Sequence, residues 1–280
     1  MRGLYSKKTI SQILDELNIA PLKKFGQNFL ADENIVEKIA DAAVCGDYVI
    51  EIGPGLGVLT DALSRRAKKV LAIEIDGGMV RALKKTLSDR NNVVVINEDV
   101  LKTDLKALAM EHFGTDEFCV AGNLPYYITA KCIMHVLESE AHVTRFTAMV
   151  QREVAQRLAA APNTSDYGAL TASIAYFGGA SEILRVSADC FLPKPDVESS
   201  VIQIIPQRQF DIKREKYTKT VRGMFAMRRK TLANNLKSSF GITGDAAARI
   251  FSAADIDPKR RAETLSAQEF ANLAQAIYDR

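Results

Sequence analysis

A glycine-rich segment, residues 51–57 (EIGPGLG), is the first part of the sequence that could bind a ligand. Gly53 and Gly55 would let backbone amides approach a ligand closely, and the N-terminus of a following helix favours a polar or negative group. Glu74 lies 21 residues after Gly53, close to the spacing at which an acidic side chain accepts hydrogen bonds from a ribose diol. Asp99 lies further on, where it could reach the adenine of the same nucleoside. The pattern predicts a site for an adenosine-containing cofactor.

Other interpretations of the glycine-rich segment are less complete. A tight turn without a ligand would need the same glycines, and either acid alone could be a helix cap. The dinucleotide pattern G-x-G-x-x-G is broken because position 58 is valine, which disfavours a nicotinamide oxidoreductase. Both acids end predicted strands, and doubly wound sheets bind their ligands there, so the combination favours the cofactor site.

The second candidate site is the segment Asn-Leu-Pro-Tyr at 123–126. Pro125 fixes one backbone torsion and biases Leu124 away from helix, which predicts a rigid extended turn. The Asn123 side-chain carbonyl and the Leu124 backbone carbonyl could then hold both hydrogens of an exocyclic amine, while Tyr126 supplies a flat stacking face. An ordinary turn with a packed tyrosine is the alternative.

This arrangement suits methyl transfer to an adenine amine. The amine is a poor nucleophile because its lone pair is conjugated into the ring. Two acceptors would pull the nitrogen toward tetrahedral geometry, aim the lone pair at a sulfonium methyl and stabilise the developing positive charge. No strong base is needed, since the methylated ammonium loses its proton readily.

Alternating strands and helices are expected to position these residues. Continuous apolar runs predict strands at 48–52, 70–75, 93–97, 118–122 and 146–150. Helical patterns lie at 10–17, at 33–43 after an N-cap at Asp32, from 58 onward, and at 79–87, 101–113, 128–137, 153–160 and 170–177. Two β-branched runs, 183–187 and 199–205, could pair at the edge of the sheet. The alternation predicts an α/β fold with a parallel sheet covered on both faces.

Composition and charge limit the possible class of protein, its domain organisation and its partners. The chain has 280 residues, with 47% hydrophobic and 25% charged residues, which is ordinary for a globular protein. At Pro206 the sequence changes character and becomes helical further on, so we expect a catalytic domain at 1–206, with an N-terminal extension at 1–24, and a small helical domain at 207–280. The net charge of +3 is too small to prove a nucleic-acid partner, so the distribution of charge must decide.

Several classes of protein are disfavoured. No apolar stretch approaches the roughly 18 residues that span a bilayer, and the first residues lack the features of a signal peptide, so a cytoplasmic chain is expected. The four cysteines and three histidines are scattered without the spacing of metal ligands or of a disulfide framework, so no metal is expected. We also expect a monomer.

Taken together, these motifs resemble the ribosomal RNA adenine N6,N6-dimethyltransferases that act on the small subunit. Further matching segments lie at 25–30 (FGQNFL), 151–154 (QREV), 167–168 (YG), 191–195 (FLPKP), 228–231 (RRKT) and 261–266 (RAETLS). The resemblance implies a Rossmann-like class I methyltransferase sheet of seven strands with a small C-terminal helical domain. It also implies S-adenosyl-L-methionine as cofactor and, as substrate, two adjacent adenosines in the 3′-terminal hairpin of small-subunit ribosomal RNA, late in subunit assembly.

The resemblance assigns roles to individual residues. Those expected to contact the cofactor are Asn28, Leu30, Gly53, Gly55, Glu74, Asp99 and Asn123. Those expected to hold the adenine are Asn123, Leu124 and Tyr126, with Phe191 flanking the base as a second aromatic residue. The family usually has a small residue and then proline after Thr129, whereas this chain has Ala130 and Lys131, which leaves the start of the next helix open.

Basic residues provide candidates for RNA contacts. Arg222, Arg228, Arg229 and Lys230 are expected on one long helix, with Arg222 and Lys230 projecting away from its apolar stripe and Arg228 in a buried ion pair. Arg222, Arg229 and Lys230 are therefore the predicted RNA-binding residues. Other basic clusters lie at 65–69 and 259–261. A solvated face explains any single cluster, but several clusters from both domains favour a surface that binds phosphates.

Two other functions stay open. Enzymes that methylate large-subunit ribosomal RNA and confer antibiotic resistance share these motifs, so only the substrate separates the two classes. The long C-terminal domain and its segment 228–231 favour the small subunit. A non-catalytic assembly factor on the same fold is disfavoured by the intact segment 123–126 and by Glu74.

Overall fold

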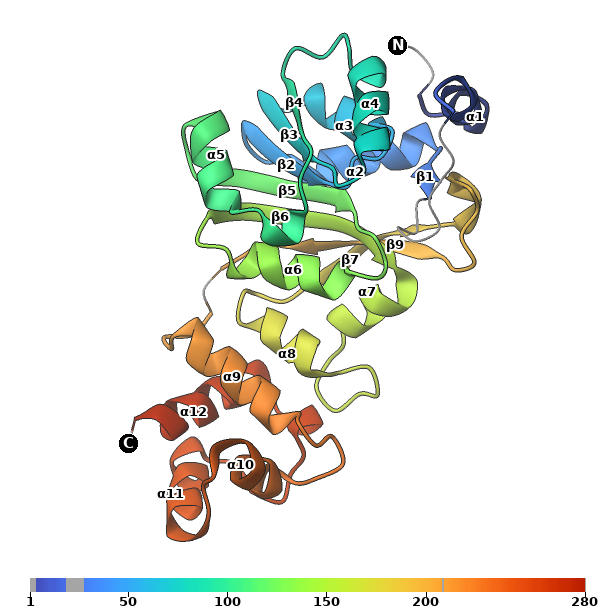
Figure 1. The fold of residues 1–280 in the computed structure, drawn as a ribbon. Helices are drawn as coiled ribbons and strands as arrows, with labels where there is room; N and C mark the ends of the chain where they lie inside the picture. The colour runs from blue at the N-terminus through green and yellow to red at the C-terminus, as the bar shows by residue number, and fades with distance from the viewer. Residues whose placement is uncertain (1–3, 19–27, 208, 280) are drawn as a thin grey trace. The chain divides into compact units, whose positions relative to one another are not determined.

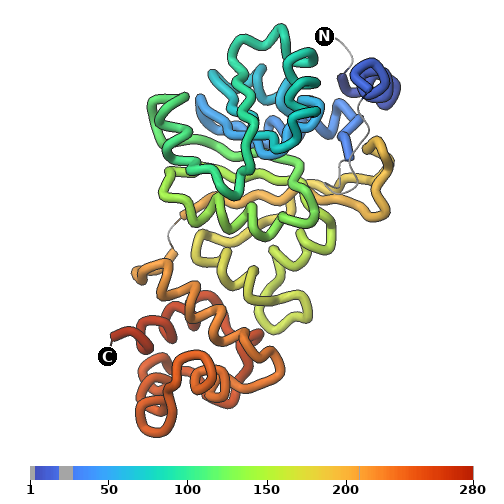
Figure 2. The backbone as a smooth tube through the Cα atoms, in the orientation of Figure 1, coloured from blue at the N-terminus to red at the C-terminus, as the bar shows by residue number. Residues whose placement is uncertain are grey.

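Two units make up the chain in the computed structural model, which describes residues 4–18, 28–207 and 209–279. The first unit combines Met1–Ala155 with Ser181–Pro206, and the second combines Gln156–Ala180 with Gln207–Arg280. The course of the backbone through both can be followed in Figure 2.

A seven-stranded sheet forms the centre of the first unit (Figure 1). Its strand order is β4-β3-β2-β5-β6-β9-β7, with the bounds Val93–Ile96, Lys69–Ile73, Tyr48–Ile52, Glu117–Asn123, His142–Gln151, Ser199–Ile204 and Ser181–Val186. The first five strands are parallel, and β9 runs antiparallel to both β6 and β7. The predicted α/β fold and the predicted pairing of the two late β-branched runs are confirmed.

Both faces of this sheet are covered. In β5, Cys119 and Ala121 share a hydrophobic core with residues of α2 (Glu33–Ala43) and α3 (Val58–Ser64). Successive side chains of a strand point to opposite faces, so Phe118 and Val120 lie on the other side, where they are also buried. Burial on both faces explains why the strands are continuous apolar runs.

The helices of the first unit lie close to their predicted positions, with one exception. Besides α2 and α3 they are α1 (Lys7–Glu16), α4 (Gly77–Thr86), α5 (Leu105–Phe113), α6 (Thr129–Glu138) and α7 (Arg152–Leu158), the last of which crosses the boundary between the units. Asp32 caps α2 as predicted. The predicted helix 101–113 is instead a short 3-10 turn, η2 (Val100–Lys102), followed by α5. It divides there because the Asp104 side chain accepts from Ala107 N at 3.0 Å and starts a new helix.

The second unit is helical, and its extent corrects the predicted domain boundary. Its helices are α8 (Ala169–Ala175), α9 (Arg214–Met224), α10 (Leu232–Phe240), α11 (Gly244–Ala254) and α12 (Ala267–Tyr278). The chain does change units at 206–207, but residues 156–180, predicted in the catalytic domain, pack with the helical unit. Two buried tyrosines of segment 156–180 donate hydrogen bonds to backbone carbonyls elsewhere in the helical unit. Tyr167 donates to Leu265 O at 2.9 Å, and Tyr176 donates to Ile212 O at 2.8 Å.

The prediction of one long basic helix that contains both Arg222 and Lys230 is wrong. Helix α9 ends at Met224, and residues 225–230 form a turn before α10. A fully buried amide holds this turn: Asn235 Oδ1 accepts from Met227 N at 2.9 Å, and Asn235 Nδ2 donates to Met227 O at 3.2 Å. Arg228 is consequently exposed, and its contact with Glu263 at 3.9 Å is a surface pair rather than a buried one.

In the described part of the chain, none of the helices has the length and apolar character needed to cross a membrane. Nor do the His, Cys, Asp and Glu side chains of that part gather in groups of three or more that could hold a metal ion.

Candidate active site

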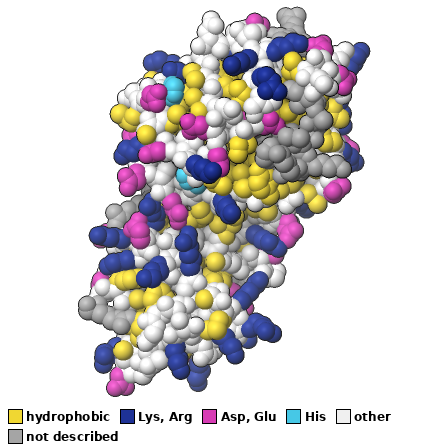
Figure 3. Space-filling model, in the orientation of Figure 1, with side chains coloured by type: hydrophobic (Ala, Val, Ile, Leu, Met, Phe, Trp, Pro, Cys, Tyr) yellow, Lys and Arg dark blue, Asp and Glu magenta, His cyan; other side chains and the backbone are white. Residues whose placement is uncertain are grey.

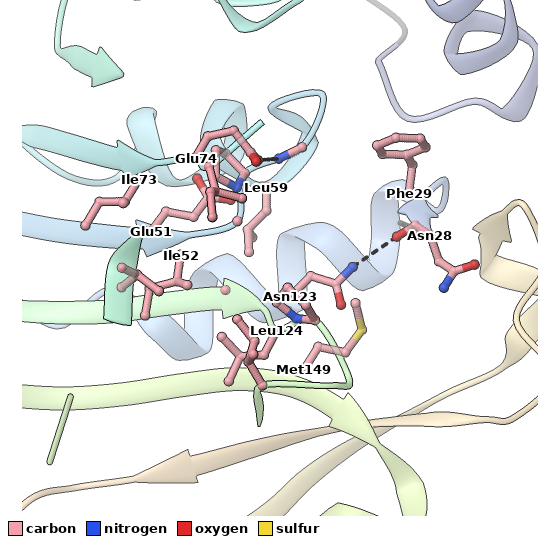
Figure 4. Close-up of a pocket in the computed structure, with 18 of the residues that line it drawn as sticks. Asn28, Phe29, Glu51, Ile52, Leu59, Ile73, Glu74, Asn123, Leu124 and Met149 are labelled. Atoms are coloured by element: carbon pink, nitrogen blue, oxygen red, sulfur yellow. Dashed lines mark hydrogen bonds between the residues drawn. The ribbon is translucent and has the colours of Figure 1, made fainter. Parts of the chain in front are cut away.

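A cavity of about 350 Å³ lies at the carboxyl ends of β2, β3 and β5. The strand order changes direction between β2 and β5, and such switch points are where open α/β sheets bind ligands. The cavity brings together residues 51–56, 58–59, 73–75, 98–101 and 122–128, which come from separate parts of the sequence. Figure 4 shows Glu51 and Glu74 in one part of it and Asn123, Leu124 and Met149 in another.

The glycine-rich turn forms the wall next to Glu74. Gly53 and Gly55 have φ angles of 68° and 57°, in the left-handed region that glycine adopts without strain. A Cβ on Gly55 would also lie only 3.3 Å from the Phe29 ring. Gly53 N donates to Ile73 O at 3.0 Å, which ties the turn to the end of β3. The two glycines therefore allow a backbone path that side chains would obstruct.

Glu74 is buried and already has backbone partners. Its carboxylate accepts from Gly55 N at 3.2 Å and from Asp76 N at 2.9 Å. A carboxylate has about four lone-pair positions, so these hydrogen bonds still leave room for a ribose hydroxyl. Burial raises the pKa of Glu74, and backbone hydrogen bonds from Asp76, Gly55 and Ile75 oppose that rise. The predicted ribose acceptor therefore also fixes the shape of the glycine-rich turn.

Glu51 is a site residue to which the sequence analysis gave no role. Its side chain is 1% exposed, lines the cavity, and leaves Oε2 without a hydrogen-bond partner. Burial raises its pKa to about 8, although the nearby Thr60 hydroxyl opposes the rise, and the Glu74 charge adds to it. An unpaired buried polar atom is costly, so this oxygen fits a polar group of a bound ligand. Its place at the start of the glycine-rich segment was the available sequence signal.

The sequence left open whether Asp99 contacts a cofactor or caps a helix, and its position in the structure is compatible with both roles. It lines the cavity, and its side chain also caps η2 by accepting from Leu101 N at 3.1 Å. Its other oxygen lies 3.9 Å from Lys102 Nζ. The capping role therefore holds the carboxylate at the cavity without excluding a ligand.

The segment 123–126 is fixed at several points. Leu124 N donates to Met149 O at 3.0 Å, and Thr129 Oγ1 donates to Pro125 O at 3.1 Å. Asn123 Nδ2 donates to the Asn28 carbonyl at 3.1 Å, which leaves Asn123 Oδ1 as the free acceptor of that amide (Figure 4). Within the described residues, no hydrogen bond is accepted by the Leu124 carbonyl. Among the described residues, both predicted acceptor oxygens are thus without a hydrogen-bond donor.

The N-terminal strand completes the wall around Asn123. Strand β1 (Phe29–Leu30) pairs with β8 (Phe191–Leu192), and Asn28 and Leu30 both line the cavity. Phe191 does not line it: the side chain is fully buried in the core with Leu30, so this structure does not place it beside a base. The neighbouring residues 25–27 of the matching segment lie outside the described residues.

The RNA-binding candidates lie in the second unit and are exposed. Arg222 is on α9, whereas Arg229 and Lys230 belong to the turn before α10. Residues 207–280 contain 15 Lys and Arg against 8 Asp and Glu, and basic side chains gather on the visible face of this unit in Figure 3. By contrast, Arg65 and Arg66 of the cluster at 65–69 pair with acidic residues of the first unit, so the charges of these two arginines are neutralised.

Comparison with known proteins identifies the family. Residues 21–279 match the sequence profile of the ribosomal RNA adenine dimethylases. This chain belongs to that family. It is 42% identical over 275 residues to Ribosomal RNA small subunit methyltransferase A of Geobacillus sp. (strain WCH70), covering 95% of this chain and 94% of the relative. It is 40% identical over 282 residues to the protein of the same name from Clostridioides difficile (strain 630), covering 99% and 98%.

Solved structures agree with this placement. A dimethyladenosine transferase from Plasmodium falciparum superposes with a TM-score of 0.73 at 25% identity, over 88% of this chain and 95% of that one. The 23S rRNA methyltransferase ErmE has the same fold, with a TM-score of 0.68 at 24% identity over 90% and 100% of the two chains. This ribosomal RNA adenine dimethylase is therefore an enzyme with a Rossmann-like methyltransferase fold, which implies a methyl donor of the S-adenosylmethionine type.

Proposed function

We propose that this enzyme transfers methyl groups from S-adenosyl-L-methionine to the N6 amines of two adjacent adenosines in the 3′-terminal hairpin of small-subunit ribosomal RNA, late in subunit assembly. The observation that carries the proposal is the pair of available acceptors, Asn123 Oδ1 and the Leu124 carbonyl, at the cavity that Glu74 and Asp99 also line. The names of the relatives support the small subunit as the substrate.

The cavity suits the cofactor because some of the polar groups that line it still have free hydrogen-bonding capacity among the described residues. Glu74 would accept the ribose hydroxyls and Asp99 would face the adenine, while the unpaired Glu51 Oε2 would hydrogen-bond a polar group of the cofactor. Asn28 and Leu30 would close the side formed by β1. When bound, the cofactor supplies an electrophilic methyl group on its sulfonium.

The chemistry on the base falls to the segment 123–126. Asn123 Oδ1 and the Leu124 carbonyl would accept the two amine hydrogens and turn the nitrogen lone pair toward the methyl group. Both oxygens also stabilise the positive charge that develops on nitrogen, and they do so without reorganising, because backbone hydrogen bonds already fix this segment. The methylated ammonium loses its proton readily, so water would take this proton without a dedicated base.

Exposed cations of the helical unit would hold the RNA. Arg222, Arg229 and Lys230 are exposed on a unit rich in basic residues, so they are suited to phosphates rather than to base edges. Such contacts provide affinity that falls with salt, whereas the choice of base is left to the segment 123–126.

The substrate is tested by offering the enzyme labelled S-adenosylmethionine with unmodified small or large ribosomal subunits. The proposal expects label in small-subunit RNA and almost none in large-subunit RNA. Label confined to the large subunit would instead place the enzyme with the resistance methyltransferases, leaving the adenine chemistry intact.

A further inference from the structure

A hydrogen bond joins Tyr126 to a residue far away in the sequence. The Tyr126 hydroxyl lies 3.2 Å from Ser199 Oγ, and the two residues are 73 positions apart. Tyr126 is half-buried and lines the cavity, whereas Ser199 is 1% exposed and does not line it. Ser199 therefore meets the tyrosine from behind the site, where it cannot touch a bound base.

Ser199 sits at a rigid position. It is the first residue of β9 and lies between two neighbouring strands, opposite Gln151 of β6 and Val186 of β7. The preceding peptide is also held, because Arg152 N donates to the Glu198 carbonyl at 3.0 Å. Within the described residues, the Ser199 hydroxyl has Tyr126 as its one side-chain partner. A buried hydroxyl on a paired strand is thus a fixed reference point for the ring.

The ring needs such a reference point. Backbone contacts fix residues 124 and 125, but they do not set the rotation of the Tyr126 side chain. The second side-chain torsion of tyrosine is broad, so the tilt of the ring is weakly defined by rotamer preference alone. A hydrogen bond at the phenol oxygen fixes the direction in which the ring axis points. Because the O–H bond and the lone pair of a phenol lie near the plane of the ring, the same bond also favours one tilt of the ring.

We propose that Ser199 is a positioning residue that orients the Tyr126 ring for stacking against the target adenine. This inference rests on the proposed function, since it assigns a partner to the stacking face. Ser199 takes no part in proton transfer and contacts neither base nor cofactor. It sets the plane against which the base is held, and thereby the alignment of the amine with Asn123 and Leu124.

The test is a double-mutant cycle of Ser199→Ala and Tyr126→Phe, read as the single-turnover methyl-transfer rate at saturating RNA. Each single variant removes the same hydrogen bond, so each should slow transfer by about 2- to 12-fold, the range for one buried hydrogen bond. The double variant should be no slower than the worse single variant, because the bond can be lost only once. Cofactor affinity should stay unchanged.

Ser200→Ala is the matched control. Ser200 is the next residue of β9 and is also fully buried, but its hydroxyl bonds to Glu182 at 3.0 Å and its side chain points to the opposite face. The variant should lose a similar hydrogen bond without slowing methyl transfer. If it slows transfer as much as Ser199→Ala does, a general weakening of β9 explains both results and the positioning role is overturned.

Other outcomes separate this inference from the proposed function. Losses that multiply in the double variant, or a Ser199→Ala enzyme with the full rate, would overturn the positioning role. Should Ser199→Ala fail to fold, Tyr126→Phe still tests the positioning role. A full rate for Tyr126→Phe would show that the hydrogen bond between Tyr126 and Ser199 has no role in methyl transfer. Full activity of Tyr126→Ala would instead remove the stacking face and with it that part of the proposed function.

Discussion

Replacing Glu51 with glutamine should change how the stability of the protein depends on pH. In the folded protein the pKa of Glu51 is about 8, against 4.5 for an ordinary glutamate, because the carboxyl is buried. The folded state therefore keeps this proton at pH values where the unfolded state has released it. The stability that the proton brings is present in full below pH 4.5 and is lost as pH rises through about 8. Glutamine has a similar shape but no proton to lose.

The size of the effect follows from the two pKa values. One pKa unit corresponds to about 1.4 kcal/mol, so the difference between 4.5 and about 8 sets an upper limit of about 5 kcal/mol. Relative to wild type, Glu51→Gln should gain up to about 1.4 kcal/mol of stability for each pH unit between 5 and 8. The gain should level off above about pH 8, where the folded wild type has also lost its proton.

Urea denaturation without cofactor, at several pH values from 5 to 9, measures this difference. Glu111→Gln is the control, because its side chain is 74% exposed and should follow wild type across the range. Parallel stability curves for wild type and Glu51→Gln would refute the reasoning, since they would mean that Glu51 titrates alike in the folded and unfolded protein.

Three further predictions concern the cofactor, the base and the RNA. Glu74→Ala should weaken S-adenosylmethionine binding by about 1.5–3 kcal/mol, because a charged acceptor is lost; unchanged affinity by calorimetry, with the fold intact, would remove Glu74 from the site. Tyr126→Ala should lose about 1–3 kcal/mol of base stacking, whereas Tyr126→Phe keeps the ring and loses only the hydrogen bond to Ser199, so it should be slowed less than Tyr126→Ala; equal and severe losses in single-turnover assays would indicate a role for the hydroxyl in the chemistry. Replacing Arg222 and Lys230 with alanine should lower RNA affinity and reduce its slope against log salt by about one unit per lost phosphate contact, with cofactor affinity unchanged; a constant slope would mean a merely solvated face.

The parts of the fold that depend on local pattern could be predicted from the sequence. Strand β2 has its predicted bounds, Tyr48–Ile52, because a buried strand is a continuous apolar run and the glycines that follow it end the pattern. Asp32 caps α2 as predicted because capping needs only the residues within one turn. The candidate cofactor residues could be found for a similar reason, since they lie where strands end.

The features that depend on distant contacts could not be predicted. Segment 156–180 joins the helical unit through Tyr167 and Tyr176, whose backbone partners lie far along the chain. The turn at 225–230 interrupts a helical pattern because of the buried Asn235 amide, which periodicity does not reveal. The same holds for the bond between Tyr126 and Ser199, and for the unpaired oxygen of Glu51, which becomes visible only when all its neighbours are placed.

The identity of the methylated nucleoside tests the central claim most directly. Unmodified small subunits would be incubated with S-adenosylmethionine and either wild-type enzyme or Asn123→Ala, and their RNA digested and mapped by mass spectrometry. The acceptor pair at Asn123 and Leu124 predicts N6,N6-dimethyladenosine at two adjacent positions near the 3′ end with wild type. It also predicts a far lower rate with Asn123→Ala at nearly unchanged RNA affinity. Methyl groups on ribose or on another base, or full activity of Asn123→Ala, would contradict the account.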